Sequence, residues 1–316
     1  MTMSQNANSV AAFYHFARLA DPPAVQQEVR HVAQAAAVKG TILIATEGVN
    51  GTIAGPSAGV DLVIAELRAL SGFAAMAVKY STASEMPFLR LKVRCKREIV
   101  TMGVADIDAA TGKGDYIAPR DWNAVIGAPD TILIDTRNGY ESAIGSFANA
   151  IAPQTDSFRD FPVWFDEFAS ALPADRPPRI AMFCTGGIRC EKATAYVKAK
   201  GFDDVVHLHG GILKYLEEVP PEESLWQGEC FLFDGRVALG HGLVERDFDL
   251  CHGCRMPLSA EDRASALFEE GVSCPHCHGQ RSDAQVARYR ERHAQVLKAA
   301  REGRSHLGDN PEPAGE

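Results

Sequence analysis

A short glycine-containing loop, Cys184-Thr-Gly-Gly-Ile-Arg-Cys190, lies between a buried apolar run and a helical stretch and has the residue types for sulfur chemistry. Its two adjacent glycines let the backbone curl until several N–H groups converge on one point, where an anion can bind. The N-terminus of the following helix adds positive potential, and Arg189 adds a full charge. Because these features stabilise an anion on sulfur, we predict that Cys184 is a thiolate at neutral pH.

The length of this loop distinguishes between two kinds of chemistry. A tyrosine-phosphatase loop places its arginine one position later, where this chain has Cys190. The shorter loop favours a cradle for a persulfide, although Cys184 could instead be a buried structural thiol. Cys190 could resolve an oxidised Cys184 as a disulfide, or it could be a structural thiol at the helix start. We expect Glu191 and Lys192 to be surface residues of the first helical turn.

Four of the eight cysteines form two Cys-x-x-Cys pairs, Cys251 with Cys254 and Cys274 with Cys277. The two pairs are separated by 19 residues, a spacing at which two knuckles can close a tetrahedral site around zinc. Four protein ligands leave no open position, so we expect a structural zinc. A four-cysteine site that holds iron is the alternative.

The middle of the chain has the α/β pattern that could position the loop. Its short, bulky apolar runs are typical of buried parallel strands and alternate with helical stretches. We expect strands at 131–134, 179–183 and 205–208, and helices near 163–171 and 191–200. Sites in such folds lie at the carboxyl ends of the strands, and Cys184 follows one of these runs directly.

The N-terminal third has the order β-α-β-β-α-β, which is typical of a ferredoxin-like sandwich. We expect strands near 11–16, 41–45, 51–54 and 74–79, and helices over 21–39 and about 57–70. Asn50-Gly51 is a hairpin turn signal between the second and third strands. A role in this hairpin is the simplest account of Asn50 and of nearby Glu47.

The stretch 88–100 continues this domain with a strict alternation of apolar and basic residues. Leu89, Leu91, Val93 and Cys95 fall on one face, and Arg90, Lys92, Arg94 and Lys96 fall on the other. The cationic face could simply be solvated. Like charges on one face repel each other, however, and a polyanion opposite them would relieve that cost. An RNA backbone is therefore the candidate partner, and Cys95 is expected to be a core thiol.

Length and composition set the remaining limits. The chain has 316 residues, of which 46% are hydrophobic and 23% charged, so whole-chain disorder is excluded. No apolar run approaches the ~18 residues of a membrane span. The N-terminus lacks a secretory signal pattern, and we expect a cytoplasmic protein with reduced thiols. The net charge of −9 argues against non-specific nucleic-acid binding, but it allows a local basic patch.

We expect three parts: an N-terminal ferredoxin-like domain at 1–113, an α/β domain at 114–225, and a four-cysteine metal-binding region at 226–316. The last part contains a basic helix near 284–301, and the final residues are expected to be a disordered tail.

Three sequence signatures occur in order along the chain. They are ATEGVNGTIAG at 45–55, CTGGIRCEKA at 184–193 and GECFLFDGRV at 228–237. With the two Cys-x-x-Cys pairs, they make residues 10–280 resemble the bacterial tRNA uridine hydroxylase family, whose members contain a rhodanese domain. The rhodanese resemblance itself covers about 115–220, because Asp135-Thr-Arg137 ends an upstream strand and Gly210-Gly211 follows the last one.

The resemblance implies oxygen-dependent hydroxylation at uracil C5 of the wobble uridine, position 34 of tRNA, to give 5-hydroxyuridine. Dioxygen would be the co-substrate and the tRNA anticodon stem-loop the partner. By this resemblance Cys184 carries the persulfide, and Arg189 orients and stabilises the bound anion. Further residues would support the loop or the domain: Thr185, Gly186, Gly187, Ile188, Cys190, Asp135 and Arg137. Glu47 and Asn50 match the family pattern and become second-tier substrate candidates.

The residues themselves show no flavin or nicotinamide fingerprint, because Thr185-Gly-Gly is too short for a dinucleotide loop. No non-haem iron triad is visible from spacing. We hypothesise that Cys184, as thiolate or persulfide, attacks uracil C6 and makes C5 electron-rich. One alternative is a sulfurtransferase that carries a persulfide on Cys184. Another is a zinc-stabilised RNA-binding module whose loop senses redox state.

Overall fold

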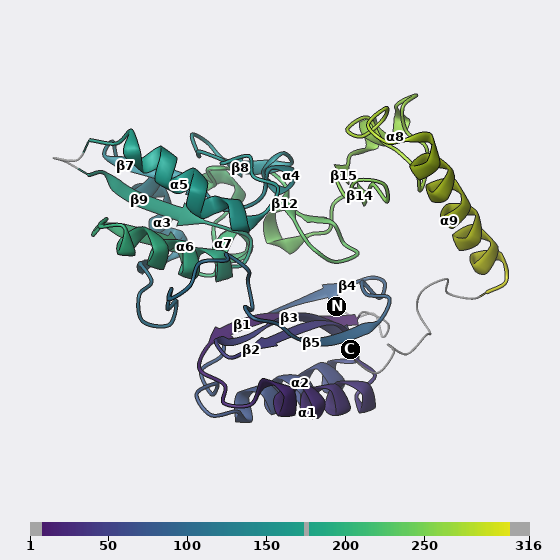
Figure 1. The fold of residues 1–316 in the computed structure, drawn as a ribbon, viewed down its shortest axis with the longest axis horizontal. Helices are drawn as coiled ribbons and strands as arrows, with labels where there is room; N and C mark the ends of the chain where they lie inside the picture. The colour runs from purple at the N-terminus through teal and green to yellow at the C-terminus, as the bar shows by residue number, and fades with distance from the viewer. Residues whose placement is uncertain (1–7, 174–176, 304–316) are drawn as a thin grey trace.

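The computed structural model describes residues 8–173 and 177–303, which form three parts along the chain. In Figure 1 an N-terminal sheet with two helices lies below an α/β part, and a smaller C-terminal part ends in a long helix. The expected combination of a ferredoxin-like domain, a rhodanese-like α/β domain and a C-terminal four-cysteine region is confirmed.

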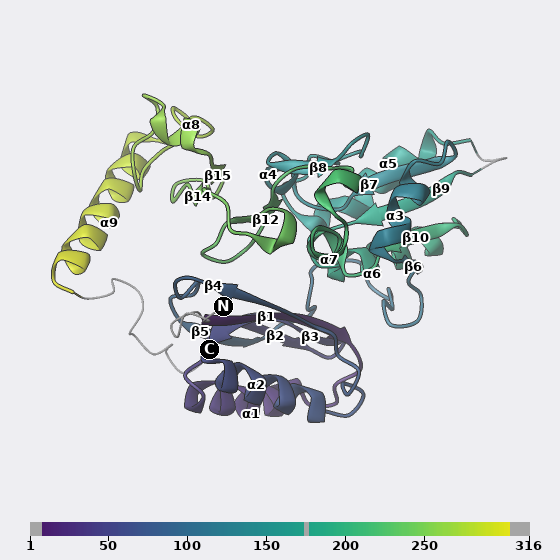
Figure 2. The same cartoon turned by 180° about the vertical axis from the view of Figure 1, so that it is seen from behind.

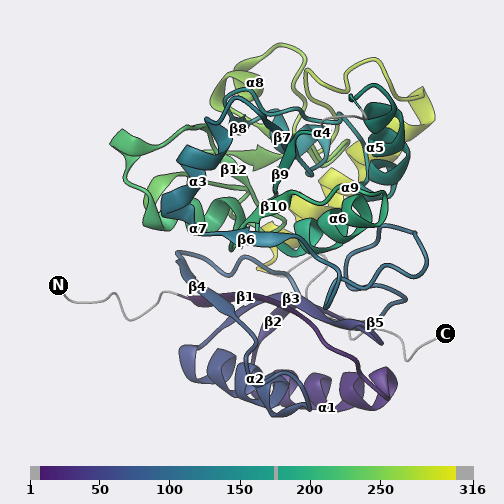
Figure 3. The same cartoon turned by 90° about the vertical axis from the view of Figure 1, so that its left-hand side faces the viewer.

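The N-terminal part is a five-stranded sheet covered on one face by two helices. Its elements are β1 (Asn8–Phe16), α1 (Pro22–Ala35), β2 (Lys39–Ala45), β3 (Gly48–Gly55), α2 (Ser57–Ala69), β4 (Val78–Ala83) and β5 (Leu91–Cys95). The strand order β4-β1-β3-β2 is that of the expected sandwich, and β5 adds a parallel edge strand beside β2. Alternate strand residues such as Phe13, Ile42 and Val93 pack against the helices. The other face of the sheet is left open toward the α/β part (Figure 3).

Helix α1 begins where expected and ends earlier. The Asp21 side chain accepts a hydrogen bond from the Ala24 N–H at 3.0 Å, which caps the first turn. The expectation that this helix runs to Lys39 is wrong. Ala37 has a φ of 53°, in the left-handed region, and the Val38 N–H turns back to the Ala33 carbonyl. Lys39 and Gly40 therefore belong to β2.

The turn between β2 and β3 is also displaced from its expected place. Ala45 pairs with Gly48, so the turn consists of Thr46 and Glu47, and Asn50-Gly51 lies within β3. The glycine at 51 serves packing, because a Cβ there would lie 2.8 Å from the Phe13 ring. The Asn-Gly turn assignment for this pair is therefore wrong.

The last two strands of this part differ from expectation in extent. β4 begins at Val78 rather than near residue 74, because turns at 70–76 bring Phe73 and Met76 into the core first. β5 covers only the centre of the alternating stretch. Leu89 is 60% exposed, and Cys95 is exposed rather than a core thiol.

The middle part is a four-stranded parallel sheet in the order β6-β10-β9-β7 with helices on both faces. Its elements are β6 (Asp115–Ile117), α3 (Pro119–Ile126), β7 (Thr131–Asp135), α4 (Gly139–Ser142), β8 (Gly145–Phe147), α5 (Phe161–Ser170), β9 (Arg179–Phe183), α6 (Ile188–Ala199), β10 (Val205–Leu208) and α7 (Gly211–Glu218). Alternate residues of β9 face opposite sides: Ile180 and Met182 pack in a core with α5 and α6, and Ala181 and Phe183 pack with α3 and α7. The predicted strands at 179–183 and 205–208 match β9 and β10.

The C-terminal part has little regular structure before its final helix. Its elements are β11 (Trp226–Gly228), β12 (Cys230–Phe231), β13 (Ala238–Leu239), β14 (Asp249–Leu250), β15 (Pro257–Leu258), α8 (Ala260–Ala264) and α9 (Asp283–Arg301). Strand β11 pairs with β8, which ties this part to the α/β part. Helix α9 is held to the cysteine region by Arg290, whose guanidinium forms an ion pair with Glu269 at 2.5 Å. The tail predicted to be disordered lies outside the described residues.

The open face of the N-terminal sheet lies against the carboxyl end of the parallel sheet in both the front and rear views (Figures 1 and 2). Segments far apart in sequence therefore meet where β9 ends. In the described ranges, none of the helices combines the length and the apolar character needed to cross a membrane.

Candidate active site

The loop after β9 forms the expected cradle around Cys184. Gly187 has a φ of 104° and caps α6, and its N–H donates a hydrogen bond to the Cys184 sulfur at 3.1 Å. The Cys184 side chain is fully buried. The N-terminus of α7 holds the other side of the loop, because the Ile212 and Leu213 N–H groups bond the carbonyls of Cys184 and Thr185. The backbone thus fixes the sulfur at the start of α6.

The electrostatics of this loop favour the thiolate. Burial by itself would raise the pKa of Cys184. The pKa of Cys184 is nevertheless lowered to about 5. The groups that outweigh burial are the Cys190 thiol, which donates a hydrogen bond, the charge of Arg189, and the N–H groups of Cys190 and Gly187. Cys184 therefore has the protonation state that a nucleophile needs at neutral pH.

Cys190 has the opposite character. It is fully buried, and its sulfur lies 3.6 Å from the Thr136 hydroxyl oxygen. Burial and the neighbouring Cys184 charge raise its pKa well above the ordinary value. Cys190 is thus a neutral hydrogen-bond donor to the Cys184 thiolate, and its role as a resolving thiol stays a prediction.

Arg189 is paired with a carboxylate that the sequence did not single out. Its guanidinium bonds both Glu141 oxygens, at 2.6 and 2.7 Å, and Glu141 is fully buried. Burial would raise the pKa of Glu141, but Arg189 and Arg137 hold it below the ordinary value. The sequence does contain a short-range signal for Glu141, because Asn138 and Glu141 have the spacing of a capping box at the start of α4.

Asp135 and Arg137 form a second buried pair behind the loop. The Arg137 guanidinium donates to both Asp135 oxygens, at 2.9 and 2.6 Å, and to the Gly145 carbonyl. These contacts join the end of β7 to β8, and the support role of the pair stays a prediction.

Two side chains of the N-terminal part reach the cysteine loop, and sequence reasoning missed both. Lys79, on β4, donates hydrogen bonds to the carbonyls of Gly186 and Gly210, each at 2.5 Å. Tyr14, on β1, lies so close to Gly187 that a Cβ there would be 2.7 Å from its hydroxyl oxygen. An isolated lysine or tyrosine in a strand carries no sequence signal for such a contact.

Glu191 and Lys192 are buried, so the expectation of surface positions is wrong. The Glu191 carboxylate accepts hydrogen bonds from Tyr14 at 2.9 Å and from Tyr116 at 2.6 Å. It also forms an ion pair with Lys113 at 3.0 Å. The N-terminal part covers the first turn of α6, and Glu191 supplies the acceptor that the tyrosine hydroxyls need there.

Lys192 makes the complementary contacts on the same helix. Its ammonium group pairs with Glu47 at 2.9 Å and with Glu98 at 2.6 Å. Glu47 also accepts from the Ile99 N–H, and the Asn50 amide donates to the Ile99 carbonyl. Glu47 and Asn50 therefore hold the connection between the two parts, and their contact with substrate stays a prediction.

A cavity of about 860 Å³ lies between the open sheet and the cysteine loop. All three sequence signatures contribute to its wall: Asn50 and Gly51 from the first, Cys184 and Arg189 from the second, and Leu232, Phe233, Asp234 and Arg236 from the third. Such a volume lies within the range of small-molecule sites. The structure thus brings three distant signatures to one site.

The third signature forms one wall of the cavity. Asp234 and Arg236 form a bidentate pair, and Arg236 also donates to the Ser81 hydroxyl at 2.7 Å, which fixes the segment against β4. Phe233 is 65% exposed although it lines the cavity. Its ring packs edge-on against Phe231 and lies 5.9 Å from the Arg189 guanidinium.

The predicted cationic strand is shorter than the sequence suggested but lies beside this cavity. Lys92 pairs in register with Thr41, and Arg94 with Leu43, and these two partners line the cavity. Neighbouring residues in register share a face, so Lys92 and Arg94 lie on the open face of the sheet. Arg90 and Lys96 flank β5 and are exposed.

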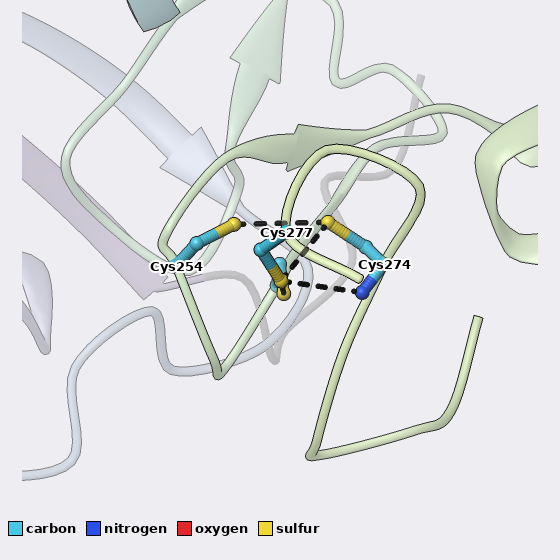
Figure 4. Close-up of side chains that lie close together, drawn as sticks. Cys254, Cys274 and Cys277 are labelled. Atoms are coloured by element: carbon cyan, nitrogen blue, oxygen red, sulfur yellow. Dashed lines mark hydrogen bonds between the residues drawn. The ribbon is translucent and has the colours of Figure 1, made fainter. Parts of the chain in front are cut away.

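The four paired cysteines, Cys251, Cys254, Cys274 and Cys277, converge in the C-terminal part, with all four sulfurs within 4.8 Å of one another. Figure 4 shows three of them with their sulfurs directed inward. The sulfur of Cys274 lies 3.7 Å from that of Cys254 and 3.8 Å from that of Cys277, and the sulfurs of Cys251 and Cys277 lie 3.9 Å apart. Sulfurs ~2.3 Å from a central ion at tetrahedral angles would lie ~3.8 Å apart, so the cluster can hold a metal ion.

The parallel sheet and the cysteine loop at the start of α6 define a rhodanese-type protein. Residues 119–218 match the rhodanese-like domain family, and residues 8–99 match the UPF0176 acylphosphatase like domain. Among solved structures, a rhodanese-related protein from Thermoplasma volcanium is 26% identical, with a TM-score of 0.27, over 34% of this chain and 95% of its own.

Similarity to known proteins extends over nearly the whole chain. A tRNA uridine(34) hydroxylase from Agrobacterium fabrum is 56% identical over 95% of this chain and 94% of its own. A tRNA uridine(34) hydroxylase from Jannaschia sp. is 55% identical over 95% of this chain and 98% of its own. The chain belongs to the tRNA uridine(34) hydroxylase family.

Proposed function

We propose that this protein hydroxylates C5 of uridine 34 in tRNA, with dioxygen as the oxidant, to give 5-hydroxyuridine. The observation that carries the proposal is the Cys184 thiolate in a cavity built from all three signatures. The relatives named above are tRNA uridine(34) hydroxylases. In the overall reaction one oxygen atom of dioxygen is inserted into the C5–H bond, which becomes C5–OH. The other is reduced to water by two electrons and two protons from an external donor.

The role of Cys184 in this proposal is to activate the ring. Its thiolate, or a persulfide on it, adds to C6, and the electron pair of the C5=C6 bond moves toward C5 and the C4 carbonyl. C5 thereby becomes electron-rich enough to react with an oxidant. The loop N–H groups that lower the pKa of Cys184 hold the sulfur as an anion before attack.

The tRNA would present the base from a single-stranded loop. RNA-binding sites commonly stack unpaired bases on aromatic rings, and the exposed Phe233 ring in the cavity wall suits that role. The cationic residues on and beside β5 (Arg90, Lys92, Arg94 and Lys96) would bind the phosphates of the anticodon stem-loop. Since tRNA is the substrate in this proposal, we infer that the protein acts in the cytoplasm.

Zinc is the metal that best suits the four-cysteine cluster, with a structural role. The four thiolates would hold it in a closed tetrahedral site that connects the segment before α8 to the segment before α9. Metal analysis of the purified protein tests this assignment. We expect zinc in the unaltered chain and its loss when Cys254 and Cys277 are replaced by serine; bound iron in the unaltered chain would contradict it.

Mass spectrometry of tRNA from a deletion strain tests the function. We expect loss of 5-hydroxyuridine, restored by the unaltered gene and not by Cys184→Ser. Undiminished hydroxylation with Cys184→Ser would end the proposed role of this cysteine.

Sulfur transfer from a persulfide on Cys184 is the second candidate function. The observation in its favour is the anion cradle itself, which stabilises a persulfide as well as a thiolate. Sulfur transfer does not account for the wall that the N-terminal part adds to the cavity. In the same experiment, loss of thiolated nucleosides with 5-hydroxyuridine retained would favour sulfur transfer.

A further inference from the structure

The proposed addition at C6 moves negative charge onto the substrate, away from Cys184. As the sulfur–carbon bond forms, the π electron pair passes through C5 to the C4 carbonyl oxygen. A fixed cation or hydrogen-bond donor at that oxygen lowers the barrier in a water-poor site. Arg189 and Lys79 are two cations that line the cavity beside Cys184.

Arg189 is the group expected from sequence, and its charge is already matched. Two of its N–H groups bond Glu141, and one of the same nitrogens also faces the Thr185 hydroxyl at 3.4 Å. The pair is buried, so Arg189 and Glu141 together approach a neutral unit. Arg189 still supports the Cys184 thiolate, but a second anion would compete with Glu141.

Lys79 differs from Arg189 in its hydrogen-bond partners and in its capacity to bind a further ligand. Its ammonium nitrogen contacts two neutral carbonyls, those of Gly186 and Gly210. Within the described residues, no carboxylate lies at ion-pair distance from it, and Glu217 acts only at longer range. An ammonium group has three protons, so one remains for a ligand after these two bonds.

The position of Lys79 fits a contact with substrate. It lies opposite Ala12 in the β1–β4 register, and both residues line the cavity together with Cys184 and Gly186. Burial lowers the pKa of Lys79 to about 8, although the nearby Cys184 charge acts in the opposite direction. Holding a cation here costs free energy, and the two carbonyls offset only part of that cost.

We propose that Lys79 is a catalytic residue, contributed by the N-terminal part, whose ammonium group donates a hydrogen bond to the pyrimidine carbonyl oxygen that becomes negative when Cys184 adds to the ring. This inference rests on the proposed function. The Cys184 lone pair forms the S–C6 bond, and the C5=C6 π pair becomes an enolate at the C4 oxygen. A solvent proton then adds at C5. Loss of the original C5 proton and of the sulfur restores the ring.

This addition and reversal needs no oxidant, so it can be measured without oxygen. Full-length protein is incubated with unmodified tRNA in deuterated water under anaerobic conditions, and deuterium at C5 of uridine 34 is followed by mass spectrometry. We expect exchange with the unaltered protein and none with Cys184→Ser. Lys79→Met should slow exchange by about 100-fold or more, the scale of losing one such donor. Lys79→Arg, which keeps the charge, should retain more exchange than Lys79→Met.

Two further measurements separate catalysis from loop support. With Lys79→Met, alkylation of Cys184 by iodoacetamide and the Kd for tRNA should both stay within ~3-fold of the unaltered protein, because the donor is needed only as charge develops. Lys200→Met, on the exposed far end of α6, is the matched control and should leave exchange unchanged. A fall in alkylation equal to the fall in exchange would make Lys79 a support for the thiolate and overturn the proposal.

The exchange experiment distinguishes failure of the role of Lys79 from failure of the addition step. Exchange that persists in Lys79→Met would reject the catalytic role of Lys79 and leave the addition of Cys184 to the ring intact. Absence of Cys184-dependent exchange in the unaltered protein would reject the addition step, and with it the role of Lys79.

Discussion

Cys184 and Cys190 show how position decides the chemistry of one side-chain type. Both are fully buried, and burial opposes charge on each. Only Cys184 receives the Gly187 N–H and the hydrogen bond of the neighbouring thiol. The result is one thiolate and one thiol that supports it, so the two cysteines have different expected reactivities.

The lowered pKa of Cys184 predicts its reactivity as a function of pH. A thiol with a pKa of about 5 is already ionised at neutral pH, so its alkylation rate should stay level down to that pH and fall below it. Replacing Cys190 by alanine removes a hydrogen bond to the thiolate and should move this midpoint upward. Iodoacetamide kinetics with mass-spectrometric assignment of Cys184 measure both. A midpoint near that of a free thiol in the unaltered protein would contradict the assigned cradle.

The buried Arg189–Glu141 pair predicts a large loss of stability when one partner loses its charge. Glu141→Gln removes the carboxylate that both ends of the buried Arg189 guanidinium bond, so the free energy of unfolding should fall by about 3 kcal/mol. Asp204→Asn breaks the exposed pair with Arg179 and is the matched control, with little expected effect. Tryptophan fluorescence in urea follows this region, because Trp122, Trp164 and Trp226 all lie in or beside it. Equal effects of the two substitutions would count against the buried pair.

The sequence allowed prediction of residues whose neighbours in the chain create the site. Cys184 was predictable because its glycines and the following helix are local. Lys79 and Tyr14 were not, since their contacts with the loop depend on how two parts of the chain pack. Glu191 and Lys192 were assigned to the surface for the same reason, because the elements that bury them come from the N-terminal third and the connection after it.

At the scale of elements, the contact between β1 and the start of α6 depends on a glycine. Gly187→Ala would place a Cβ 2.7 Å from the Tyr14 hydroxyl oxygen and strain a residue with a φ of 104°. Gly201→Ala is the matched control, because Gly201 has a φ of 94° and open space around its Cβ position. We expect Gly187→Ala to lower hydroxylation and thermal stability more than Gly201→Ala. Adding Tyr14→Phe to Gly187→Ala should recover part of the loss, and no recovery would mean that the contact is not the cause.

The edge strand β5 carries the prediction for RNA binding. Charge reversal at Arg90, Lys92 and Arg94 should weaken tRNA binding and flatten its dependence on salt, by about 0.7 to 0.9 in the logarithmic slope for each phosphate that is no longer neutralised. Charge reversal at Lys198 on α6 and at Lys200, which follows this helix, is the control for surface charge. Fluorescence titrations at several salt concentrations give the slopes. An unchanged slope would mean that the cationic face of this strand is solvated and does not contact RNA phosphates.

Among the elements, the buried parallel strands were the most predictable. Bulky apolar runs covered on both faces defined β9 and β10 to the residue. The elements predicted with errors were those in which the local signal competed with packing. Asn50-Gly51 is a strong turn signal, yet the Phe13 ring requires a glycine inside β3. Strict alternation at 88–100 suggested a long strand, but α1 covers only the part near Val93, where Gln26 and Arg30 bond its carbonyl.

At the scale of the whole molecule, no single part contains the site. The α/β part supplies the Cys184 loop, the N-terminal part supplies Lys79 and Tyr14, and the segment after β12 supplies Phe233 and Arg236. This division explains why the three signatures lie so far apart in the chain. The net charge of −9 is compatible with RNA binding, because the basic residues on and beside β5 form a local cationic surface next to this cavity.

We propose that the composite site uses Cys184 to add an oxygen atom from dioxygen to uridine 34. This step is tested with purified full-length protein, unmodified tRNA, an external electron donor and isotopically labelled dioxygen, followed by mass spectrometry of the nucleosides. We predict labelled 5-hydroxyuridine from the unaltered protein and none from Cys184→Ser. Label-free product formed under labelled dioxygen, or equal labelled product from Cys184→Ser, would contradict the claim.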